Sequence, residues 1–484
     1  MKRMGGIAAV AVLALVAGCG KPDPEGQLDA KTRVQRHYVN MFAYNVMDTY
    51  YLWREEVKAK LDKWEEREEP IAKVAEVRYK DAAGKDVDRW TMLTDDFASF
   101  EGGVSGHTRT LGMDFQLYYY DKTHTRIVAV VTFAYADSPA AKAGIGRGDT
   151  ILTVEGKELT PKNYQDLISD HIFGGGTVRL GLDGDRSVTL TAVDMYEDPV
   201  HTARILEGPG GKKVGYLHYT SFTLDSCEDL VEVFRHFTEE GIGDLVLDLR
   251  YNSGGYVIAE NVLASMVAPL AEVEAGSVFS RVIYNPLLTE ELGEESTAFD
   301  TGFVFKVNGN LRVVSTKGAN PDLPRLYVLT SGTSASASES LVCGLRPYMD
   351  VILVGAQTSG KFCAGFLLEA KEWFDDVKKS LDEGEYDTAL PYVDNWGIYV
   401  MYARYADCNG RTLSMPDGIA PDVEVEDDPT EGIALGDPRE KMLSTALDLM
   451  SGRTRASAGR AVSSLEPVPE GFHPRNPGIL VGRY

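Results

Sequence analysis

The chain has 484 residues, of which 44% are hydrophobic and 25% charged. This length is enough for about two to four domains with buried cores, and the composition is that of a soluble globular protein. Its formal net charge of −24 at pH 7 argues against nucleic-acid binding and against electrostatic docking to anionic lipid, because both need exposed patches of lysine and arginine.

The N-terminus has the pattern of an export signal. Lys2 and Arg3 precede an apolar run over residues 7–17, which is too short to span a bilayer. The run ends in Val16-Ala17-Gly18-Cys19, which resembles a bacterial lipobox and predicts acylation at Cys19. The alternative is a plain signal peptide with an incidental cysteine.

Four further cysteines follow the leader, at positions 227, 343, 363 and 408. None forms a C-x-x-C pair, so we predict no metal site. An exported protein can oxidise its thiols, but the spacing leaves the pairing of Cys227, Cys343, Cys363 and Cys408 open. Cys363 lies close to a lysine discussed below, and the sequence favours a small buried apolar role for it over a reactive thiol.

Residues 20–33 are polar and rich in proline and glycine, which predicts a flexible tether. The following segment, 34–103, has the pattern of a small helical domain. Its apolar residues recur at helical spacing, at Tyr38, Phe42, Val46 and Tyr50, and a highly charged helix is expected next, over residues 55–68.

Between residues 104 and 195 the pattern changes to short strands and turns. The stretch SPAAKAGIGRGDTILTVEGK, which begins at Ser138, is its most specific part, and the order of elements resembles a PDZ domain. That resemblance implies a groove beside the strand after Gly112, in which a peptide adds as an extra strand. The terminal carboxylate of the peptide would bind to backbone N–H groups of the loop Leu111, Gly112, Met113, Asp114 and Phe115.

From Val214 the chain alternates strands and helices, which predicts an α/β fold with parallel strands. Strands are expected over 214–218, 244–249, 325–329, 351–354 and 396–405, and helices over 230–240, 256–267 and 337–348. Residues 366–395 have the composition of an inserted, partly charged loop. Near the C-terminus, Asp437 is expected to cap a helix that has Pro438 in its first turn and ends before Gly452.

Three segments of this α/β region are expected to meet at one edge of the sheet. Ser336 immediately precedes the predicted helix 337–348, and Lys361 follows the next strand, 25 residues later. In a right-handed βαβ unit a helix begins at the edge where the parallel strands end, so Ser336 and Lys361 can lie together. The loop after strand 244–249, which contains Gly254 and Gly255, reaches the same edge.

These residues have the chemistry of a serine–lysine dyad. Ser336 would be the nucleophile and Lys361, as a free amine, the base. A lysine at its ordinary pKa of about 10.4 is charged at neutral pH, so the pocket must be poor in water, and Phe362 and Phe366 are its expected walls. The backbone N–H groups of Ala337 and of Gly254 or Gly255 would form an oxyanion hole.

The motifs resemble those of the S41 family of carboxyl-terminal processing, or tail-specific, peptidases. The matching residues are 248–255 (DLRYNSGG), 336–339 (SASE), Gly355 with Gly360-Lys361, and 418–422 (GIAPD). The resemblance implies a ClpP/crotonase-like core and supports the roles given to Ser336, Lys361 and the oxyanion-hole residues. Many members continue Gly-Lys-Gly-x-x-Gln, and Gly365 stands here in place of that glutamine, so the third catalytic member is unassigned or absent. Ser338 and Glu339 could help to orient the site, and the alternative for Glu339 is a favourable interaction with the helix dipole alone.

The sequence therefore predicts a multidomain α/β protein with an N-terminal helical domain and a PDZ-like β-rich domain. We expect a metal- and cofactor-free serine endopeptidase, anchored by lipid in the bacterial cell envelope, that acts on proteins or peptides near their C-termini. Two alternatives are a catalytically weak relative that binds partner C-termini through the PDZ-like domain, and a crotonase-like acyl-CoA enzyme. The expected units are the signal peptide 1–19, the tether 20–33, the helical domain 34–103, the PDZ-like domain 104–195, the protease core 196–452 and the tail 453–484.

Overall fold

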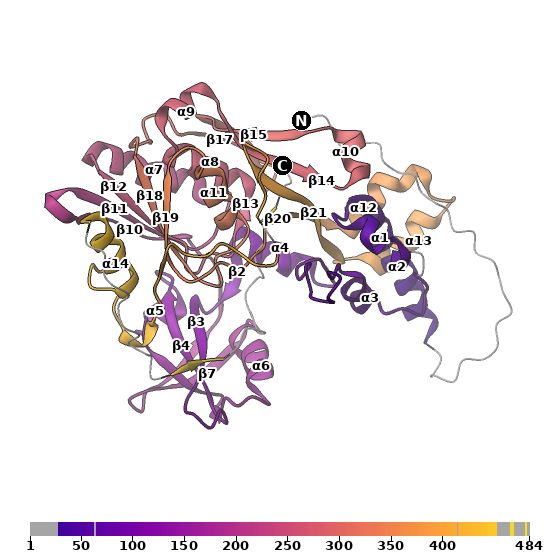
Figure 1. The fold of residues 1–484 in the computed structure, drawn as a ribbon. Coiled ribbons are helices and arrows are strands. Elements are labelled where there is room, and N and C mark those ends of the chain that lie inside the picture. Colours follow the sequence, from indigo (N-terminus) through magenta and orange to yellow (C-terminus); the bar gives the residue numbers. More distant parts are fainter. Residues whose placement is uncertain (1–27, 62–63, 414, 453–464, 469–479, 482–484) are drawn as a thin grey trace.

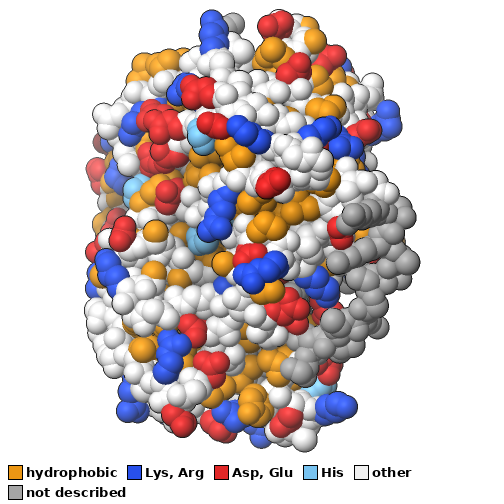
Figure 2. Space-filling model, turned by 90° about the vertical axis from the view of Figure 1, so that its left-hand side faces the viewer, with side chains coloured by type: hydrophobic (Ala, Val, Ile, Leu, Met, Phe, Trp, Pro, Cys, Tyr) orange, Lys and Arg blue, Asp and Glu red, His pale blue; other side chains and the backbone are white. Residues whose placement is uncertain are grey.

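The computed structural model describes residues 28–61, 64–413, 415–452, 465–468 and 480–481 (Figure 1). The predicted signal peptide, Cys19 and most of the tether lie outside these residues. Within them, no helix combines the length and the apolarity needed to cross a membrane. On the face drawn in Figure 2, basic side chains are interspersed with acidic ones and form no extended basic area.

The chain begins with a group of helices that shares its core with a distant part of the sequence. Its elements are α1 (Ala30–Tyr50), α2 (Arg54–Leu61), α3 (Pro70–Val77), β1 (Met92–Thr94) and α4 (Phe97–Ser105). Asp29 caps α1 by accepting hydrogen bonds from two backbone N–H groups, so the helix starts inside the predicted tether. The charged helix expected over 55–68 ends at Leu61. Buried residues of α1, such as Phe42, pack with Trp373 and Phe374, and Figure 1 shows α1 beside α12 and α13.

The next region, which we call the β-rich module, contains β2 to β9. A two-stranded ladder of β2 (His107–Thr110) and β9 (Val193–Tyr196) joins it to the rest of the molecule. Its main sheet is antiparallel and has the order β23-β3-β4-β5-β7-β8. The bounds are β3 (Met113–Tyr119), β4 (Ile127–Ala134), β5 (Thr150–Val154), β6 (Lys157–Glu158), β7 (Thr177–Leu182), β8 (Ser187–Thr191), α5 (Pro139–Lys142), α6 (Tyr164–Leu167) and, from the C-terminal end of the chain, β23 (Glu466–Pro467).

The α/β core, residues 200–452, is built on a six-stranded sheet of order β10-β11-β12-β18-β19-β22. The pairs from β11 to β22 are parallel, as the sequence predicts, and β10 is antiparallel at one edge. The strands are β10 (Val200–Glu207), β11 (Lys213–Tyr219), β12 (Asp244–Asp248), β18 (Arg325–Thr330), β19 (Asp350–Gly355) and β22 (Val423–Glu424).

Helices cover both faces of this sheet, because its strands are apolar on both sides. Leu245 and Leu247 of β12 face the helices α7 (Ser226–Glu240), α8 (Val257–Val267) and α11 (Ala337–Leu345). Val246, between them, faces α14 (Lys441–Met450) on the other side. The alternation fixes the orientation of β12, and with it the edge at which its loop emerges.

A second sheet, of order β13-β24-β20-β21-β14-β15, joins the core to the N-terminal helices, and β1 also pairs with β21. Its strands are β13 (Gly255–Tyr256), β24 (Leu480–Val481), β20 (Cys363–Glu369), β21 (Gly397–Asp407), β14 (Val278–Tyr284) and β15 (Glu295–Ala298). Nearby are α9 (Leu270–Ala275), α10 (Pro286–Leu292) and the hairpin of β16 (Gly302–Val307) and β17 (Asn310–Ser315).

Two local expectations are wrong. Residues 366–395 are not a loop: they hold most of β20 and the helices α12 (Ala370–Val377) and α13 (Glu385–Val393), whose apolar face is hidden in the sequence by intervening charges. The last helix is capped by Glu440, which accepts hydrogen bonds from the N–H groups of Met442 and Leu443. Asp437 instead binds the N–H and the guanidinium of Arg439.

Candidate active site

The three segments that the sequence places at one edge of the sheet are joined there by hydrogen bonds. The Ser334 hydroxyl donates to the Leu249 carbonyl (2.8 Å), and the Ser338 hydroxyl donates to the Asn252 carbonyl (3.0 Å). The Ser359 N–H donates to the Ser334 carbonyl (2.9 Å), which connects the segment after β19 to the same turn. The loop after β12, the start of α11 and the segment that carries the lysine therefore form one cluster.

Ser336 occupies a strained position at the start of α11. Its backbone has φ +60° and ψ −114°, a conformation that residues other than glycine rarely adopt, and its side chain is buried. The Ser336 hydroxyl has no hydrogen-bond partner among the described residues. A strained turn between a strand and a helix also presents the nucleophilic serine in α/β-hydrolases.

Glu339 ties this turn to the lysine segment. One oxygen of its buried carboxylate accepts hydrogen bonds from the N–H groups of Ser336 (3.0 Å) and Lys361 (2.8 Å). The other accepts from the N–H of Gly360 (2.8 Å) and the hydroxyl of Thr358 (2.5 Å). Burial raises the pKa of Glu339, and these bonds oppose that effect. The backbones of the two predicted dyad residues are thus held by one carboxylate oxygen.

The Lys361 side chain lies in a fully buried, aromatic environment. Its amine donates a hydrogen bond to the Tyr399 hydroxyl (3.0 Å) and lies 5.0 Å from the centroid of the Tyr399 ring and 5.7 Å from that of Trp90. Burial lowers the pKa of Lys361 to about 8, so a useful fraction of the amine is uncharged near neutral pH. In this structure the amine is not hydrogen-bonded to the Ser336 hydroxyl.

The walls of this pocket differ from those expected. Phe362 packs against Tyr405, and Phe366 packs against Tyr50 and Tyr402. The residues that sequence reasoning missed are Trp90 and Tyr399, which come from the N-terminal region and from β21. No spacing rule relates either residue to Lys361, so the sequence offers no signal for them.

The predicted oxyanion-hole residues lie in the same cluster. Ala337 is the first residue of α11, where a backbone N–H has no acceptor inside the helix. The Gly254 N–H donates to the Asn252 side chain (2.8 Å), and Gly255 pairs with Leu480 of β24. Gly255 has φ +146°, and a Cβ there would lie 2.2 Å from the Phe222 carbonyl oxygen, so the loop requires glycine.

The predicted peptide-carboxylate loop, Leu111 to Phe115, begins β3 of the β-rich module. The Leu111 carbonyl accepts the N–H of Ala140, and the Gly112 N–H donates to the Thr110 hydroxyl. The edge of β3 that would receive a peptide is partly paired already. At the C-terminal end of β3, Tyr118 and Tyr119 pair with β23 of the same chain.

Among the described cysteines, Cys363 lies nearest to Lys361 in the sequence and is not a reactive thiol. All four described cysteines are free thiols, and Cys363 is buried with its sulfur against Met401. Burial raises the pKa of Cys363, so its thiol stays protonated at neutral pH. Within the part of the chain that the structure describes, there is no cluster of three or more His, Cys, Asp or Glu residues that could hold a metal ion.

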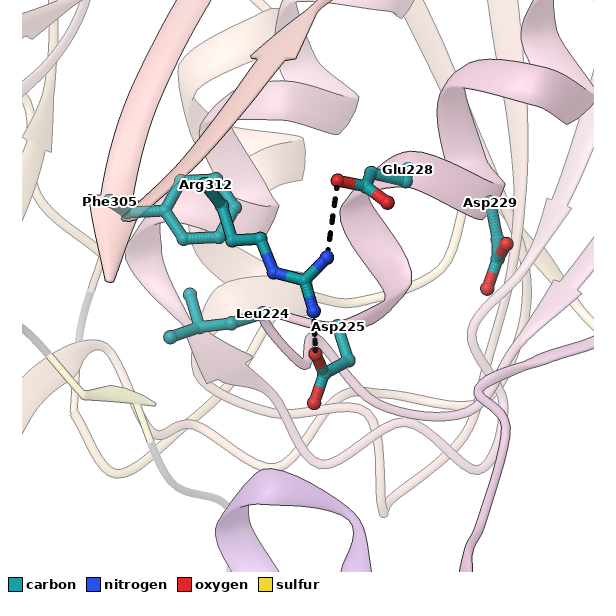
Figure 3. Close-up of a pocket in the computed structure, with 6 residues that line it drawn as sticks. All are labelled: Leu224, Asp225, Glu228, Asp229, Phe305 and Arg312. Atoms are coloured by element: carbon teal, nitrogen blue, oxygen red, sulfur yellow. Dashed lines mark ion pairs between the residues drawn. The ribbon is translucent and has the colours of Figure 1, made fainter. Parts of the chain in front are cut away.

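A separate acidic pocket lies between α7 and the β16–β17 hairpin (Figure 3). Arg312 enters it from β17 and forms ion pairs with Glu228 (3.6 Å) and Asp225 (3.9 Å). Leu224, Asp229 and Phe305 complete the lining, which includes neither Ser336 nor Lys361.

Part of the chain matches a known protein family, and its sequence and fold are similar to those of several known proteins. Residues 213–425 match the family model "Peptidase family S41". The chain is 25% identical over 344 residues to the chloroplastic C-terminal processing peptidase of Tetradesmus obliquus, covering 68% of this chain and 62% of that protein. It is 26% identical over 330 residues to the carboxyl-terminal-processing protease of Synechocystis sp., covering 66% and 64%.

The chain thus spans just under two thirds of the length of these relatives. Its fold is similar to the crystal structure of a Bacteroides fragilis protein described as an S41 protease. That likeness has a TM-score of 0.64 at 22% identity and covers 90% of this chain and all of the other.

Proposed function

We propose, on the premise that residues 213–425 are a domain of peptidase family S41, that this chain is a serine endopeptidase that cleaves proteins or peptides near their C-termini. The observation that carries the proposal is that a buried Ser336 with a strained backbone and a buried Lys361 both donate their backbone N–H groups to the Glu339 carboxylate. The curated relatives act as carboxyl-terminal processing proteases by name, which supports the same activity here.

In the proposed reaction the Lys361 amine takes the proton of the Ser336 hydroxyl as the oxygen attacks the substrate carbonyl carbon. The oxyanion of the tetrahedral intermediate accepts hydrogen bonds from the N–H groups of Ala337 and of Gly254 or Gly255. Lys361 then passes its proton to the leaving amine, and a water molecule, deprotonated by Lys361, hydrolyses the acyl-enzyme. With a pKa of about 8, about a tenth of the Lys361 amine is free at pH 7.

The β-rich module and the N-terminus complete the proposal. The module is a PDZ-like domain in which the loop Leu111 to Phe115 and the edge of β3 select substrate C-termini. Cys19 carries a lipid that anchors the protein in the bacterial cell envelope, with the module and the core outside the bilayer. No nucleic acid, metal or cofactor takes part.

The experiment is to label the full-length protein with a fluorophosphonate probe, map the modified peptide by mass spectrometry, and measure cleavage of an unfolded protein substrate. We expect the label on Ser336, no label or cleavage with Ser336→Ala, and strong loss of both with Lys361→Met. Cleavage that persists in either variant would contradict the dyad, and cleavage blocked by a chelator would contradict metal independence.

A second candidate is a catalytically weak protein that binds partner C-termini through the β-rich module. The observation that favours it is the absence of a hydrogen bond between the Ser336 hydroxyl and the Lys361 amine in this structure. Unlabelled Ser336 in a folded protein that still binds C-terminal peptides would select this candidate.

A further inference from the structure

We propose that the Tyr399 hydroxyl positions the Lys361 amine for catalysis, an inference that rests on the proposed peptidase function. The amine donates to this hydroxyl at 3.0 Å, and both side chains are buried. Tyr399 is itself fixed in the middle of β21, where it pairs with Leu367 of β20 on one side and Met92 of β1 on the other. A rigid strand therefore sets the location of the amine.

The neighbouring strand β20 has a glycine, Gly365, where the Tyr399 ring packs against it. Gly365 lies in β20, four residues after Lys361, and a Cβ at this position would lie 2.4 Å from both the Tyr399 Cζ and the Met401 Cε. Side chains are not tolerated at such distances, so the ring fills the space that a side chain at 365 would need. The Tyr399 ring therefore explains why position 365, where many relatives have glutamine, is a glycine in this chain.

The hydrogen bond has a chemical consequence. When the amine donates one N–H to the tyrosine oxygen, its lone pair remains available for the Ser336 proton. The tyrosine oxygen also stabilises the ammonium form more than the amine, because a charged donor makes the stronger bond. The titratable groups that raise the pKa of Lys361 are Cys363, Asp88 and Glu339, and the Tyr399 hydroxyl is the group in hydrogen-bond contact with its amine.

The test is Tyr399→Phe, which removes only the hydroxyl and keeps the ring. We expect kcat to fall by about ten-fold with KM nearly unchanged, and the rising limb of the pH profile of kcat/KM to move to lower pH. A fall in kcat with an unmoved pH profile would reduce Tyr399 to a packing residue and overturn the proposal, as would unchanged kinetics. Tyr402→Phe, from the same strand, is the matched control and should leave the profile in place.

A second readout does not depend on peptidase activity. Titration of the Lys361 side chain by NMR in the Ser336→Ala protein gives its pKa directly, with Lys361→Arg used to assign the signal. Tyr399→Phe should lower this pKa, and an unchanged value would overturn the proposal even if no substrate is ever cleaved. A lowered pKa in a protein that cleaves nothing would leave the contact established and reject the proposed function instead.

Independently, we infer that residues 465–468 are a peptide ligand of the β-rich module of their own chain and that residues 480–481 are a ligand of the slot beside the proposed dyad. Residues 466–467 add to the edge of β3, the Val468 N–H donates to the Leu117 carbonyl (2.9 Å), and Glu466 pairs with His124 (2.9 Å). Leu465 and Val468 pack on the two apolar clusters of the module.

The direction of this segment is that of a bound peptide. β23 is antiparallel to β3, so the chain passes Tyr119, Tyr118 and Leu117 in turn and heads toward the loop Leu111 to Phe115. An extended peptide that adds to a sheet edge gains the same backbone bonds, so the segment and an incoming peptide compete for one edge.

The segment is found again at the candidate active site. β24 lies between β13 and β20 and is parallel to both: Leu480 pairs with Gly255, and Val481 pairs with Tyr256 and Gly365. One neighbour is thus the glycine loop of the oxyanion hole, and the other is the strand that follows Lys361. A substrate strand in this slot would have to displace residues 480–481.

The test uses full-length Ser336→Ala protein, so that nothing is cleaved, and a fluorescent peptide of residues 464–484. Leu465→Asp/Val468→Asp should detach the segment and tighten binding of the peptide, read by anisotropy, about ten-fold or more, since the internal competitor is lost. The matched control places the same two charges on exposed apolar residues of the hairpin, Leu311→Asp/Val313→Asp, and should not change the affinity.

Amide hydrogen exchange gives the second measurement. Detachment should speed exchange along β3 near Leu117 and Tyr119 in the double variant and not in the control. Equal peptide affinity in the two variants, or a peptide that binds neither, would overturn the inference, and so would unchanged exchange along β3.

Discussion

At the scale of single residues, the site depends on one amine that is kept away from water. The Lys361 amine lies near the rings of Trp90 and Tyr399, and among the effects on its pKa only burial lowers it. The carboxylates nearby act in the opposite direction, and burial outweighs them. The pKa of the proposed base is therefore lowered by burial in the aromatic pocket rather than by a neighbouring positive charge.

This account predicts a pH dependence for the proposed activity. The base must be uncharged, so kcat/KM should rise with pH through the lowered pKa and reach half of its plateau near pH 8. The measurement is kcat/KM for a peptide substrate between pH 6 and 10. A rate that is already at its plateau at pH 6, or that falls across this range, would mean that Lys361 is not the base.

The backbone of Ser336 predicts a difference between two inactive variants. Its φ of +60° with ψ −114° is unfavourable for serine and alanine but accessible to glycine. Both Ser336→Gly and Ser336→Ala should abolish cleavage, and Ser336→Gly should have the higher free energy of unfolding, by about 1 kcal/mol after the entropy of the unfolded glycine is allowed for. Urea unfolding of the two variants measures this, and equal stabilities would show that the turn carries no strain.

The individual residues differ in how far the sequence could predict them. Ser336, Lys361 and the glycines follow strands or begin a helix, so parallel topology alone brings them to one edge. Trp90 and Tyr399 could not be predicted, because they reach the lysine through tertiary pairing of β1 with β21 and of β21 with β20. For Glu339 the sequence left two roles open, orientation of the site or interaction with the helix dipole, and it gave no signal for the bonds to Gly360 and Lys361.

At the scale of elements, the start of α11 and the segment after β19 behave as one unit. Glu339 accepts hydrogen bonds from three backbone N–H groups and one hydroxyl, all of them buried.

The helices and strands of the α/β core were predicted accurately from the sequence where the strands are continuous apolar runs, as in β12, β18 and β19. The prediction was wrong for residues 366–395, because charged residues on the outer faces of α12 and α13 give that segment the composition of a loop.

The hydrogen bonds of Glu339 predict a large loss of stability when this residue is replaced by alanine. Glu339→Ala would leave several buried donors without an acceptor, so we expect a loss of about 3 to 5 kcal/mol in the free energy of unfolding, or failure to fold. Chemical denaturation measures this, with Glu290→Ala on an exposed position of α10 as the control, expected within about 0.5 kcal/mol of wild type. Similar stabilities of the two variants would show that the carboxylate does not hold the site together.

At the scale of the whole molecule, the β-rich module is bound to the α/β core by a buried ionic cluster. Arg147, from the module, pairs with Asp427 (2.6 Å) and donates to the Tyr251 hydroxyl, and Arg250 pairs with the same Asp427. Burial opposes ionisation of Asp427, but the two guanidiniums outweigh it and lower the pKa of Asp427 to about 2. Tyr251 follows β12 in the loop that leads to Gly254, so the cluster connects the module to the site.

We predict that Arg147→Met loosens this junction. Asp427 keeps Arg250, so the loss should be about 2 to 3 kcal/mol, below that of an entirely unpaired buried charge. Thermal unfolding and amide exchange at the junction measure it, and Arg186→Met, which breaks a more exposed pair with Asp149, is the control with an effect of at most about 1 kcal/mol. If both variants unfold alike, the module is held by other contacts.

The wall that Trp90 provides for Lys361 has a consequence for the newly made chain. Trp90 is held in place by β1, and β1 pairs with β21, whose residues are synthesised more than 300 positions later. Until β21 has been synthesised, the aromatic surroundings of Lys361 are incomplete, because Tyr399 belongs to β21. On the proposed function, proteolysis therefore cannot begin before the chain has been made as far as β21 (Gly397–Asp407).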